Sequence, residues 1–508
     1  MKKYLLLSVV SAFCIANLHA QFFLGLRGSP YGGVTNVDYN PAIANSPFLV
    51  DINLIAVAAT VNNNYVGIAR KAILHPALFN DANFQQDFMH ERVNGRNKNA
   101  YVGAQLTGPL SFMFSFGRKN HKSENAIAFT YHMNVVGNVE NVNETLARIA
   151  YYGLGTSAQT ATNFLGQSLS NANLGLKGAA WNDFGITYSR VVWDKGENLI
   201  KVGGTLKLLQ PLVGAYAQIS NLNYKWPEYG LLSINRTSVS YAYSEGLITS
   251  KGYSASAISQ ALPGYLNNVF GTKYGTPTAA ADMGAVYEWH PDRSKYSADY
   301  NCDCQSLKDR DKYKLAVGFS IIDFGALRFK RGEYSQNFYA NINNWQVVGD
   351  KFPNGLQSLD DTIQSRFQVL PTKGYFTVWL PTRFNIFIDY NIYKDFGVTV
   401  ATTVSPDMSP TQNMLTQVTT ISVTPKYDSK WIGVYLPLSY DVNGNFSLGT
   451  TLRLGPLTIG TQDLLGLFVK KYIYNADIHA SLKITIPYHG ICKKGDFRFI
   501  KKAPVDFG

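Results

Sequence analysis

The stretch FNIFIDYNI, residues 384–392, alternates between a large apolar side chain and, in most cases, a polar one. Successive side chains of an extended strand point to opposite faces, so this period of two predicts a β-strand with one apolar face. The stretch is also long enough for a tilted strand to cross a lipid bilayer. The apolar face would carry Phe384, Ile386, Ile388, Tyr390 and Ile392, and the other face Asn385, Phe387, Asp389 and Asn391.

The same alternation recurs at 200–208, 282–290, 446–454 and 478–486. A soluble β-sandwich also alternates, with its apolar face in the core, so alternation alone leaves both classes open. The stretches are longer than an ordinary strand, and aromatic residues lie near strand ends, which favours a membrane-spanning barrel. These aromatic residues are Tyr101, Trp181, Trp193, Trp289, Tyr390, Trp431 and Tyr440.

The composition agrees with a β-rich protein. The chain has 508 residues, 46% hydrophobic and 16% charged, with 32 Tyr and 29 Phe. So many apolar residues exclude a disordered chain, and so few charged ones exclude a helical bundle. The formal charge is 46 − 34 = +12, but basic residues cluster only in the tail 489–508. We expect this tail to be solvated and periplasmic, and we expect no nucleic-acid partner.

The first 20 residues contain two lysines, an apolar run and a small residue, Ala20, before Gln21. This pattern predicts a secretory signal peptide at 1–20 that is cleaved near Gln21. After Ala20, no uninterrupted apolar stretch approaches the roughly 18 residues that a spanning helix needs. A closed barrel can still cross a membrane, because it satisfies every backbone hydrogen-bonding group. We therefore expect an all-β chain that forms a closed transmembrane antiparallel β-barrel, in contact with the lipid of the outer membrane of a Gram-negative bacterium.

Turn signals divide the chain into about 14 to 18 extended runs. Tight turns are predicted at 194–197, 391–395 and 441–444, where each joins two alternating runs. Outer-membrane barrels carry long loops outside and short turns in the periplasm, so most of the long connections are expected to be extracellular. These longer polar connections lie at 138–180, 246–280, 291–311 and 349–366.

Two short motifs recur. A Pro-Leu pair occurs in GPLSF, QPLVG, LPLSY and GPLTI, and proline within a sheet marks strand starts, bulges or edges. The triplet Asp-Phe-Gly, or Asp-Met-Gly, occurs in NDFGITY, ADMGAVY, IDFGALR and KDFGVTV. We interpret it as the opening of a strand just after a turn. A kinase reading of Asp323-Phe324-Gly325 is excluded, since no glycine-rich loop or catalytic loop accompanies it.

Enzyme chemistry is not indicated. No nucleophile motif and no zinc-protease histidine pair occurs, so we predict no catalytic residue, no metal and no cofactor. Export into an oxidising compartment favours a disulfide among the mature-chain cysteines Cys302, Cys304 and Cys492. Either Cys302 or Cys304 can pair with Cys492. A metal site with His290 or Asp303 is the weaker alternative.

The segment VDYNPAIANSPFLVDINLIAVAATVNNNYVGI, residues 37–68, resembles the N-terminal signature of an uncharacterised family of Bacteroidota outer-membrane proteins. That family is distantly similar to the FadL fatty-acid transporter and the PorV secretion subunit. The resemblance continues through WNDFGITYSR, ADMGAVYEW, LAVGFSIIDFGALRF, LRLGPLTIG and LKITIP, and so covers most of the mature chain.

The resemblance implies a barrel of 14 strands over 48–488 and a plug-like segment over 21–47 that folds into the lumen. Within this segment Asn40 can cap a short helix that begins with Pro41 and Ala42.

Two functions remain open. A passive transporter of a small or hydrophobic solute predicts an interior cavity lined by polar residues with apolar gaps. A barrel subunit that anchors or assists a secretion or surface-assembly complex predicts a filled lumen, with function carried by the long loops, the basic tail and a partner protein. The sequence leans slightly toward transport. The candidate lumen-facing residues are Lys201, Lys207, Asp389, Asn391, Arg453 and Lys483.

Overall fold

The computed structural model describes most of the chain. The described residues are 23–44, 48–109, 111–118, 122–152, 165–227, 231–245, 275–291, 313–346, 356–407, 413–429 and 431–487. Three predictions lie outside them: the signal peptide 1–20 with its cleavage near Gln21, a disulfide among Cys302, Cys304 and Cys492, and the basic tail 489–508.

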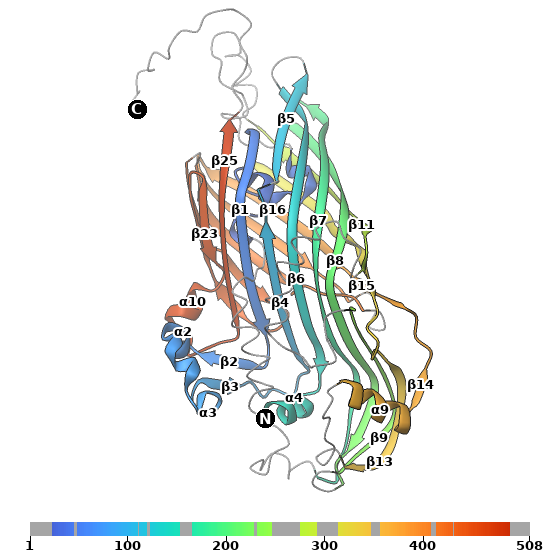
Figure 1. The fold of residues 1–508 in the computed structure, drawn as a ribbon. Coiled ribbons are helices and arrows are strands. Elements are labelled where there is room, and N and C mark those ends of the chain that lie inside the picture. Colours follow the sequence, from blue (N-terminus) through green and yellow to red (C-terminus); the bar gives the residue numbers. More distant parts are fainter. Residues whose placement is uncertain are drawn as a thin grey trace, which may run out of the picture.

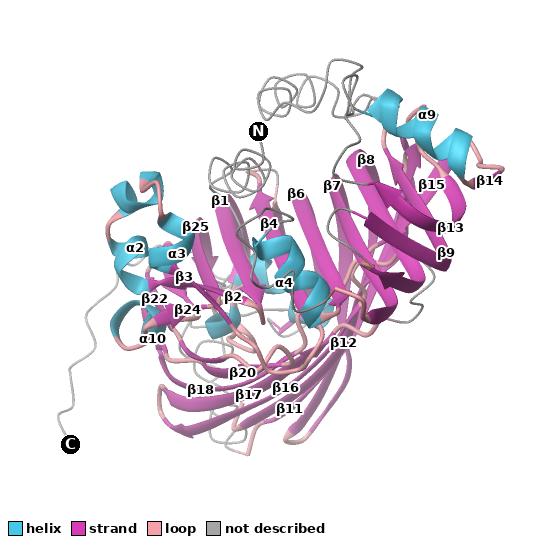
Figure 2. Cartoon of the chain, turned by 90° about the horizontal axis from the view of Figure 1, so that it is seen from below, coloured by secondary structure: helices cyan, strands magenta, loops and turns pink. Residues whose placement is uncertain are grey.

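One antiparallel sheet closes on itself to form a barrel (Figures 1 and 2). The first strand, β1 (Phe48–Asn63), pairs with the last, β25 (Asn475–Pro487), along almost its whole length. Its other edge pairs with β4 (Lys98–Thr107) and β5 (Phe112–Arg118), which lie end to end. When such fragments are taken together, the described residues form a ring of 14 strands, as expected.

The remaining strands follow around the ring in sequence order, with three more pairs of fragments. They are β6 (Lys122–Val142), β7 (Ser168–Lys195), β8 (Asn198–Lys225), β11 (Thr278–Trp289), β12 (Leu315–Lys330), β15 (Tyr375–Trp379) with β16 (Arg383–Tyr393), β17 (Phe396–Val404), β18 (Thr420–Asp428), β19 (Ile432–Tyr435) with β20 (Leu438–Asp441), β21 (Phe446–Leu448) with β22 (Thr450–Leu454), and β23 (Leu457–Thr461).

The two faces of these strands are reversed relative to a soluble protein. On β16, Ile386 and Ile388 are exposed, whereas Asn385 and Asp389 on either side of this pair are buried. The predicted alternation also holds on β8, β11, β22 and β25, where apolar side chains face outward and mainly polar ones inward. An exposed apolar belt around a polar interior is the pattern of a barrel whose outer surface contacts lipid. It excludes the sandwich alternative, which needs its apolar face inside.

Tyr101 and Trp181 are exceptions to the predicted ring of interfacial aromatic residues, because both are buried. Trp181 lies on the same face of β7 as Asp183, and Tyr101 on the same face of β4 as Gln105, so both point into the barrel. A position near a predicted strand end does not determine whether a side chain faces the lipid or the barrel interior. Trp193, Tyr390, Trp431 and Tyr440 are exposed, as expected.

The recurring Pro-Leu pairs were predicted to mark strand starts, bulges or edges, and they lie at strand breaks, at a register shift and in a turn. Pro109 lies in the break between β4 and β5, where the backbone N–H of Asn53 donates to the carbonyl oxygen of Ser111 (2.8 Å). Pro211 lies at a register shift between β7 and β8. Pro437 separates β19 from β20, and Pro456 lies in the turn before β23.

The two ends of the barrel differ. Tight turns at 196–197, 394–395 and 455–456 join strands at one end, and the longer connections that carry helices lie at the other (Figure 1). None of the helices among the described residues is long and apolar enough to cross a membrane. The helices at the long-connection end are α2 (Arg70–Leu74), η4 (Pro76–Asn80), α3 (Phe84–Phe88), α4 (Glu144–Tyr152), α9 (Leu356–Arg366) and α10 (Leu464–Phe468). A small sheet of β24 (Tyr472–Ile473), β2 (Val66–Ala69) and β3 (Met89–Glu91) lies there too.

The connection expected at 138–180 is shorter than predicted, because strands occupy both of its ends. β7 and β8 each have 28 residues, and their distal halves continue the sheet beyond the ring with β9 (Leu231–Tyr243), β13 (Asn337–Gln346) and β14 (Gln368–Leu370). A strand that lies outside the bilayer needs no apolar outer face. Its sequence therefore lacks the alternation of apolar and polar residues from which the spanning strands were predicted. Similarly, the connection at 349–366 contains α9, whose Ile363 packs on Phe338 and Ala340. A two-residue strand, β10 (Gly275–Thr276), pairs with β12.

The N-terminal segment, residues 23–44, lies inside the ring. It forms three 3-10 helices, η1 (Leu24–Leu26), η2 (Gly33–Asn36) and η3 (Pro41–Ala44). Leu26 packs against β1 and β19, Val34 against β5 and β6, and Tyr39 against β11, β12, β16 and β17. A segment that contacts strands all around a closed ring must lie within it.

Candidate functional site: the barrel interior

The N-terminal segment is fixed by polar side chains of the wall. The ammonium group of Lys483 donates to the carbonyl oxygens of Tyr31 and Gly32, each at 2.8 Å, and lies 3.3 Å from the carboxylate of Asp51. The hydroxyl of Ser29 donates to Asp428 (2.7 Å). These groups are buried, so removing one partner of a pair would leave the charge or the hydrogen-bonding group of the other partner buried and unpaired.

Asn40, Pro41 and Ala42 begin the η3 turn. The side-chain oxygen of Asn40 accepts from the backbone N–H of Ala42 (3.0 Å), and its amide donates to the carbonyl oxygens of Ala285 (3.3 Å) and Phe319 (3.1 Å). Asn40 therefore both caps the turn and joins it to β11 and β12. The wall leaves little room here, since a Cβ at Gly203 would lie 2.5 Å from the carbonyl carbon of Pro41. A glycine is required at this close approach.

A charged layer crosses the interior beside this segment. Lys207 on β8 lies 2.9 Å from Asp282 on β11 and 2.6 Å from Asp323 on β12. Asp323 also pairs with Arg383 at 2.5 Å. All four residues are buried or nearly so, so each charge is balanced by an opposite charge on a neighbouring strand.

His132 on β6 connects this charged layer to the N-terminal segment. Its Nδ1 lies 2.8 Å from Asp183 on β7, and its Nε2 lies 2.9 Å from Asp38 of the segment. The imidazole therefore bridges two carboxylates, one on the wall and one on the segment.

Three of these carboxylates come from the repeated Asp-Phe-Gly and Asp-Met-Gly triplets, and this corrects our interpretation of the motif. Asp183, Asp282 and Asp323 lie within β7, β11 and β12 rather than after a turn. Only Asp395 lies at a turn, directly before β17. The pairing of the strands brings Asp282 and Asp323 together at Lys207, and Asp183 lines the same cavity as Lys207 and Asp323. Spacing along the chain did not reveal this, because it depends on how the strands pair.

The six candidate lumen-facing residues all contact other interior groups. Lys207, Asp389, Arg453 and Lys483 are buried, and Lys201 and Asn391 are half-buried nearer the tight-turn end. Each has a polar partner on another residue of the interior. The partners are Glu288 for Lys201 (2.6 Å), Asp282 and Asp323 for Lys207, Lys426 for Asp389 (2.7 Å), the carbonyl oxygen of Tyr313 for Asn391 (2.6 Å), Asp428 for Arg453 (3.1 Å) and Asp51 for Lys483.

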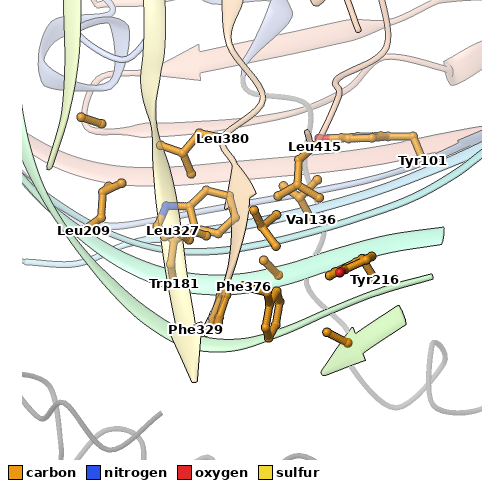
Figure 3. Close-up of a cluster of buried hydrophobic side chains, with 14 of the residues drawn as sticks. Tyr101, Val136, Trp181, Leu209, Tyr216, Leu327, Phe329, Phe376, Leu380 and Leu415 are labelled. Carbon is orange, nitrogen blue, oxygen red and sulfur yellow. The ribbon is translucent and has the colours of Figure 1, made fainter. Parts of the chain in front are cut away.

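An apolar cluster fills the interior on the long-connection side of the charged layer (Figure 3). We call it the apolar layer. It draws side chains from several strands of the ring, and Phe329 and Phe376 stack within it with ring centroids 5.3 Å apart. Its members are Tyr101, Val136, Ala179, Trp181, Leu209, Tyr216, Ala242, Ala280, Leu327, Phe329, Phe376, Val378, Leu380, Leu415 and Val418.

Leu415 and Val418 belong to an inward segment, residues 413–419, which turns into the barrel between β17 and β18. The backbone N–H of Leu415 donates to the carbonyl oxygen of Trp379 (2.9 Å), and the amide of Asn138 donates to the carbonyl oxygen of Thr416 (2.9 Å). We did not anticipate this segment or the apolar layer. An apolar residue facing inward and one facing lipid give the same period-two signal.

A cavity of about 20 Å³ separates the apolar and charged layers. It has room for about one water molecule. Its walls combine charged residues such as Asp183 and Lys207 with Tyr101 and Trp181 of the apolar layer. Among the described residues, no group of three His, Cys, Asp or Glu side chains is arranged to hold a metal ion.

Comparison with known proteins adds a family and a distant likeness of fold. Residues 41–462 match the model of a family of unknown function (DUF5723). No curated protein matches the sequence. Among solved structures, the chain is similar to a deltaS2S3 mutant of the monoaromatic hydrocarbon channel TodX, with 10% identity, coverage of 90% of this chain and 95% of that one, and a TM-score of 0.41.

Two further solved structures are more distant. The monoaromatic hydrocarbon channel CymD has 8% identity, covers 92% and 99% of the two chains and gives a TM-score of 0.28. A FadL homologue from Pseudomonas aeruginosa has 8% identity, covers 93% and 99% and gives a TM-score of 0.20. At this distance no ligand-binding residue can be transferred.

Proposed function

The chain belongs to the DUF5723 family, whose function is unknown, so its role must be inferred from its own structure; we propose that it is an outer-membrane channel for small hydrophobic solutes. The exposed apolar belt supports a location within a bilayer, and closed barrels of this kind are typical of the outer membrane of Gram-negative bacteria. The interior supports the choice of solute.

The observation that carries the proposal is the apolar layer inside a barrel whose interior is otherwise polar. A water-filled pore is lined by polar groups throughout. Here Trp181, Phe329 and Phe376 form an aromatic surface on the inner side of the wall. Apolar surface that faces a lumen favours binding of an apolar solute that leaves water.

In this state the channel is closed by two segments with different anchors. The N-terminal segment is held by buried charged groups such as Lys483. The inward segment is also bound to the wall, by Lys177 and Asn138 among others, but it places Leu415 in the apolar layer. Displacement of the inward segment would uncover the apolar layer, because Leu415 and Val418 belong to it, whereas no residue of the N-terminal segment does. We therefore assign solute entry to the long-connection end.

Trp181 provides a direct test, because its indole ring is part of the apolar layer. Titration of purified protein in detergent with an alkylbenzene should change tryptophan fluorescence saturably, and glucose should not. Trp181→Phe keeps an aromatic ring in the layer but should remove most of the change. Vesicles that contain the protein should then take up the alkylbenzene faster than empty vesicles. Absence of both saturable binding and faster uptake would rule out the proposal.

The second candidate is a non-transporting subunit of a secretion or surface-assembly complex. Its support is the filled interior, together with the lobe of β9, β13, β14 and α9 that projects beyond the ring. Liposome swelling and single-channel conductance separate the two functions. No hydrophobic uptake, combined with a protein that co-purifies stably, would favour this subunit role.

A further inference from the structure

An apolar and basic surface lies at the outer margin of the barrel, at the long-connection end. α2 and α10 lie beside each other there, outside the ring of strands in both views (Figures 1 and 2). Phe468 and Val469 are each 70% exposed, and Leu74 is 52% exposed. Side chains this large and apolar are costly to leave in water when they lie together.

Basic groups lie among these apolar side chains. Arg70 is held in place, since its backbone N–H donates to the carbonyl oxygen of Lys471 (3.0 Å) and its guanidinium donates to the carbonyl oxygen of Phe468. Lys71 is exposed, and the Lys471 ammonium lies 5.2 Å from the centroid of the Tyr472 ring. Within the described chain, no carboxylate lies at ion-pair distance from Arg70, Lys71 or Lys471. The surface is therefore positively charged.

This surface continues the lipid-facing belt. Phe468 and Val469 lie in the connection between β23 and β25, whose Ile459 and Ile478 are exposed on the outer face of the barrel. A side chain at the outer margin, beside the end of a lipid-facing strand, lies at the level of the headgroups when the strand spans the bilayer. Leu74 is the last residue of α2, and α2 lies on the same margin (Figures 1 and 2).

We propose that this surface, the basic shelf of Arg70, Lys71, Leu74, Phe468, Val469 and Lys471, binds the phosphate-bearing headgroups of anionic lipids. The inference rests on the membrane location proposed above, and it is independent of solute transport. Arginine and lysine side chains bind phosphate oxygens, and Phe468, Val469 and Leu74 enter the outer part of the acyl layer. Basic groups next to an apolar surface are the combination that a charged bilayer surface attracts.

Lipid is a better occupant than a partner protein because of where the shelf lies. Its apolar members are continuous with a belt that already contacts acyl chains, so a protein seated on Phe468 would have to displace lipid. A soluble phosphate would engage Arg70 or Lys471 and leave the exposed apolar side chains unexplained.

The test compares charge removal at the shelf with the same charge removal elsewhere. The shelf variant combines Arg70→Gln, Lys71→Gln and Lys471→Gln. The control combines Arg96→Gln, Lys225→Gln and Arg236→Gln, at exposed basic positions outside the shelf. Full-length protein in detergent micelles is titrated with phosphatidylglycerol and, separately, with phosphatidylcholine. The apparent Kd for phosphatidylglycerol should rise about tenfold or more in the shelf variant and stay unchanged in the control.

Three outcomes would overturn the proposal. The first is an equal Kd for phosphatidylglycerol in wild type and shelf variant, and the second is an equal loss of affinity for phosphatidylglycerol in the control variant. The third is displacement of bound phosphatidylglycerol by inorganic phosphate, which would indicate a site for a soluble anion. A second variant, Phe468→Ser with Val469→Ser, should weaken the binding of both lipids if these side chains enter the acyl layer.

The result is separable from the outcome for transport. A wild-type protein that fails to insert into phosphatidylcholine vesicles contradicts the membrane location itself. Normal insertion and normal alkylbenzene binding, without preference for the anionic lipid, contradict only the shelf.

Discussion

The two halves of the barrel interior are filled in different ways. On the tight-turn side, the N-terminal segment is fixed by directional contacts, such as those of Lys483 with the carbonyl oxygens of Tyr31 and Gly32. On the long-connection side, the inward segment places Leu415 and Val418 in the apolar layer. Its backbone is bound to the wall, but these two side chains make apolar contacts only. Buried polar contacts hold one geometry, whereas apolar packing tolerates an exchange of one apolar group for another of similar volume. The difference indicates a fixed half and an exchangeable half.

The largest effect is expected for Lys483→Ala, on the fixed side. The substitution leaves the carboxylate of Asp51 and two carbonyl oxygens buried without their cationic partner. Breaking a buried pair in this way costs about 4 kcal/mol. Arg27 is buried in the same segment, so trypsin can cleave after it only when the segment leaves the interior. Cleavage after Arg27 should therefore accelerate strongly in the folded variant.

Lys195→Ala is the matched control, because Lys195 is exposed at the turn after β7. It should change stability by no more than about 0.5 kcal/mol. Equal protection of Arg27 in Lys483→Ala and wild type would show that the segment is held by packing alone, and the contrast between the two halves would disappear.

Much of the fold could be predicted from the sequence, because one local rule governs each spanning strand. The alternation of FNIFIDYNI fixed which side of β16 meets lipid, and Asp389 and Ile388 lie on the faces expected. The Pro-Leu pairs marked the strand breaks for an equally local reason, since proline lacks a donor for the ladder.

The interior could not be predicted in the same way, because it depends on contacts between distant strands. Asp282 and Asp323 meet at Lys207 only through the register of β8, β11 and β12. Leu415 enters the apolar layer through a connection that has no periodicity of its own. The Asp-Phe-Gly triplets signalled that carboxylates recur, but turn-like composition concealed that they lie within strands.

A smaller but more selective effect is expected for Leu415→Ala, on the exchangeable side. Leu415 is fully buried, so truncation should lower the free energy of unfolding by about 3 kcal/mol and leave a cavity in the apolar layer. An alkylbenzene can fill an apolar cavity and should restore part of the lost stability. Thermal unfolding is monitored by the mobility shift of the barrel on gels, with and without the alkylbenzene. It measures both the loss of stability and its partial restoration.

Leu26→Ala gives the same truncation on the fixed side, where Leu26 is also fully buried. Its cost should be similar, but it lies away from the apolar layer, so the alkylbenzene should restore little. Equal restoration in both variants would mean that the solute enters any apolar cavity and that the two halves do not differ in access.

The smallest effect is expected for Ser29→Ala, which tests whether the fixed half depends on charge or on hydrogen bonding in general. The Ser29 hydroxyl donates to Asp428 (2.7 Å), but that carboxylate keeps Tyr435 (2.6 Å) and Arg453 (3.1 Å) as partners after the substitution. Its charge therefore stays compensated, and the loss should be about 1 kcal/mol, the net value of one hydrogen bond. Trypsin cleavage after Arg27 should accelerate far less than in Lys483→Ala. If the two variants release the segment equally, each contact is part of one cooperative network, and the fixed half would open as a unit whichever contact is lost.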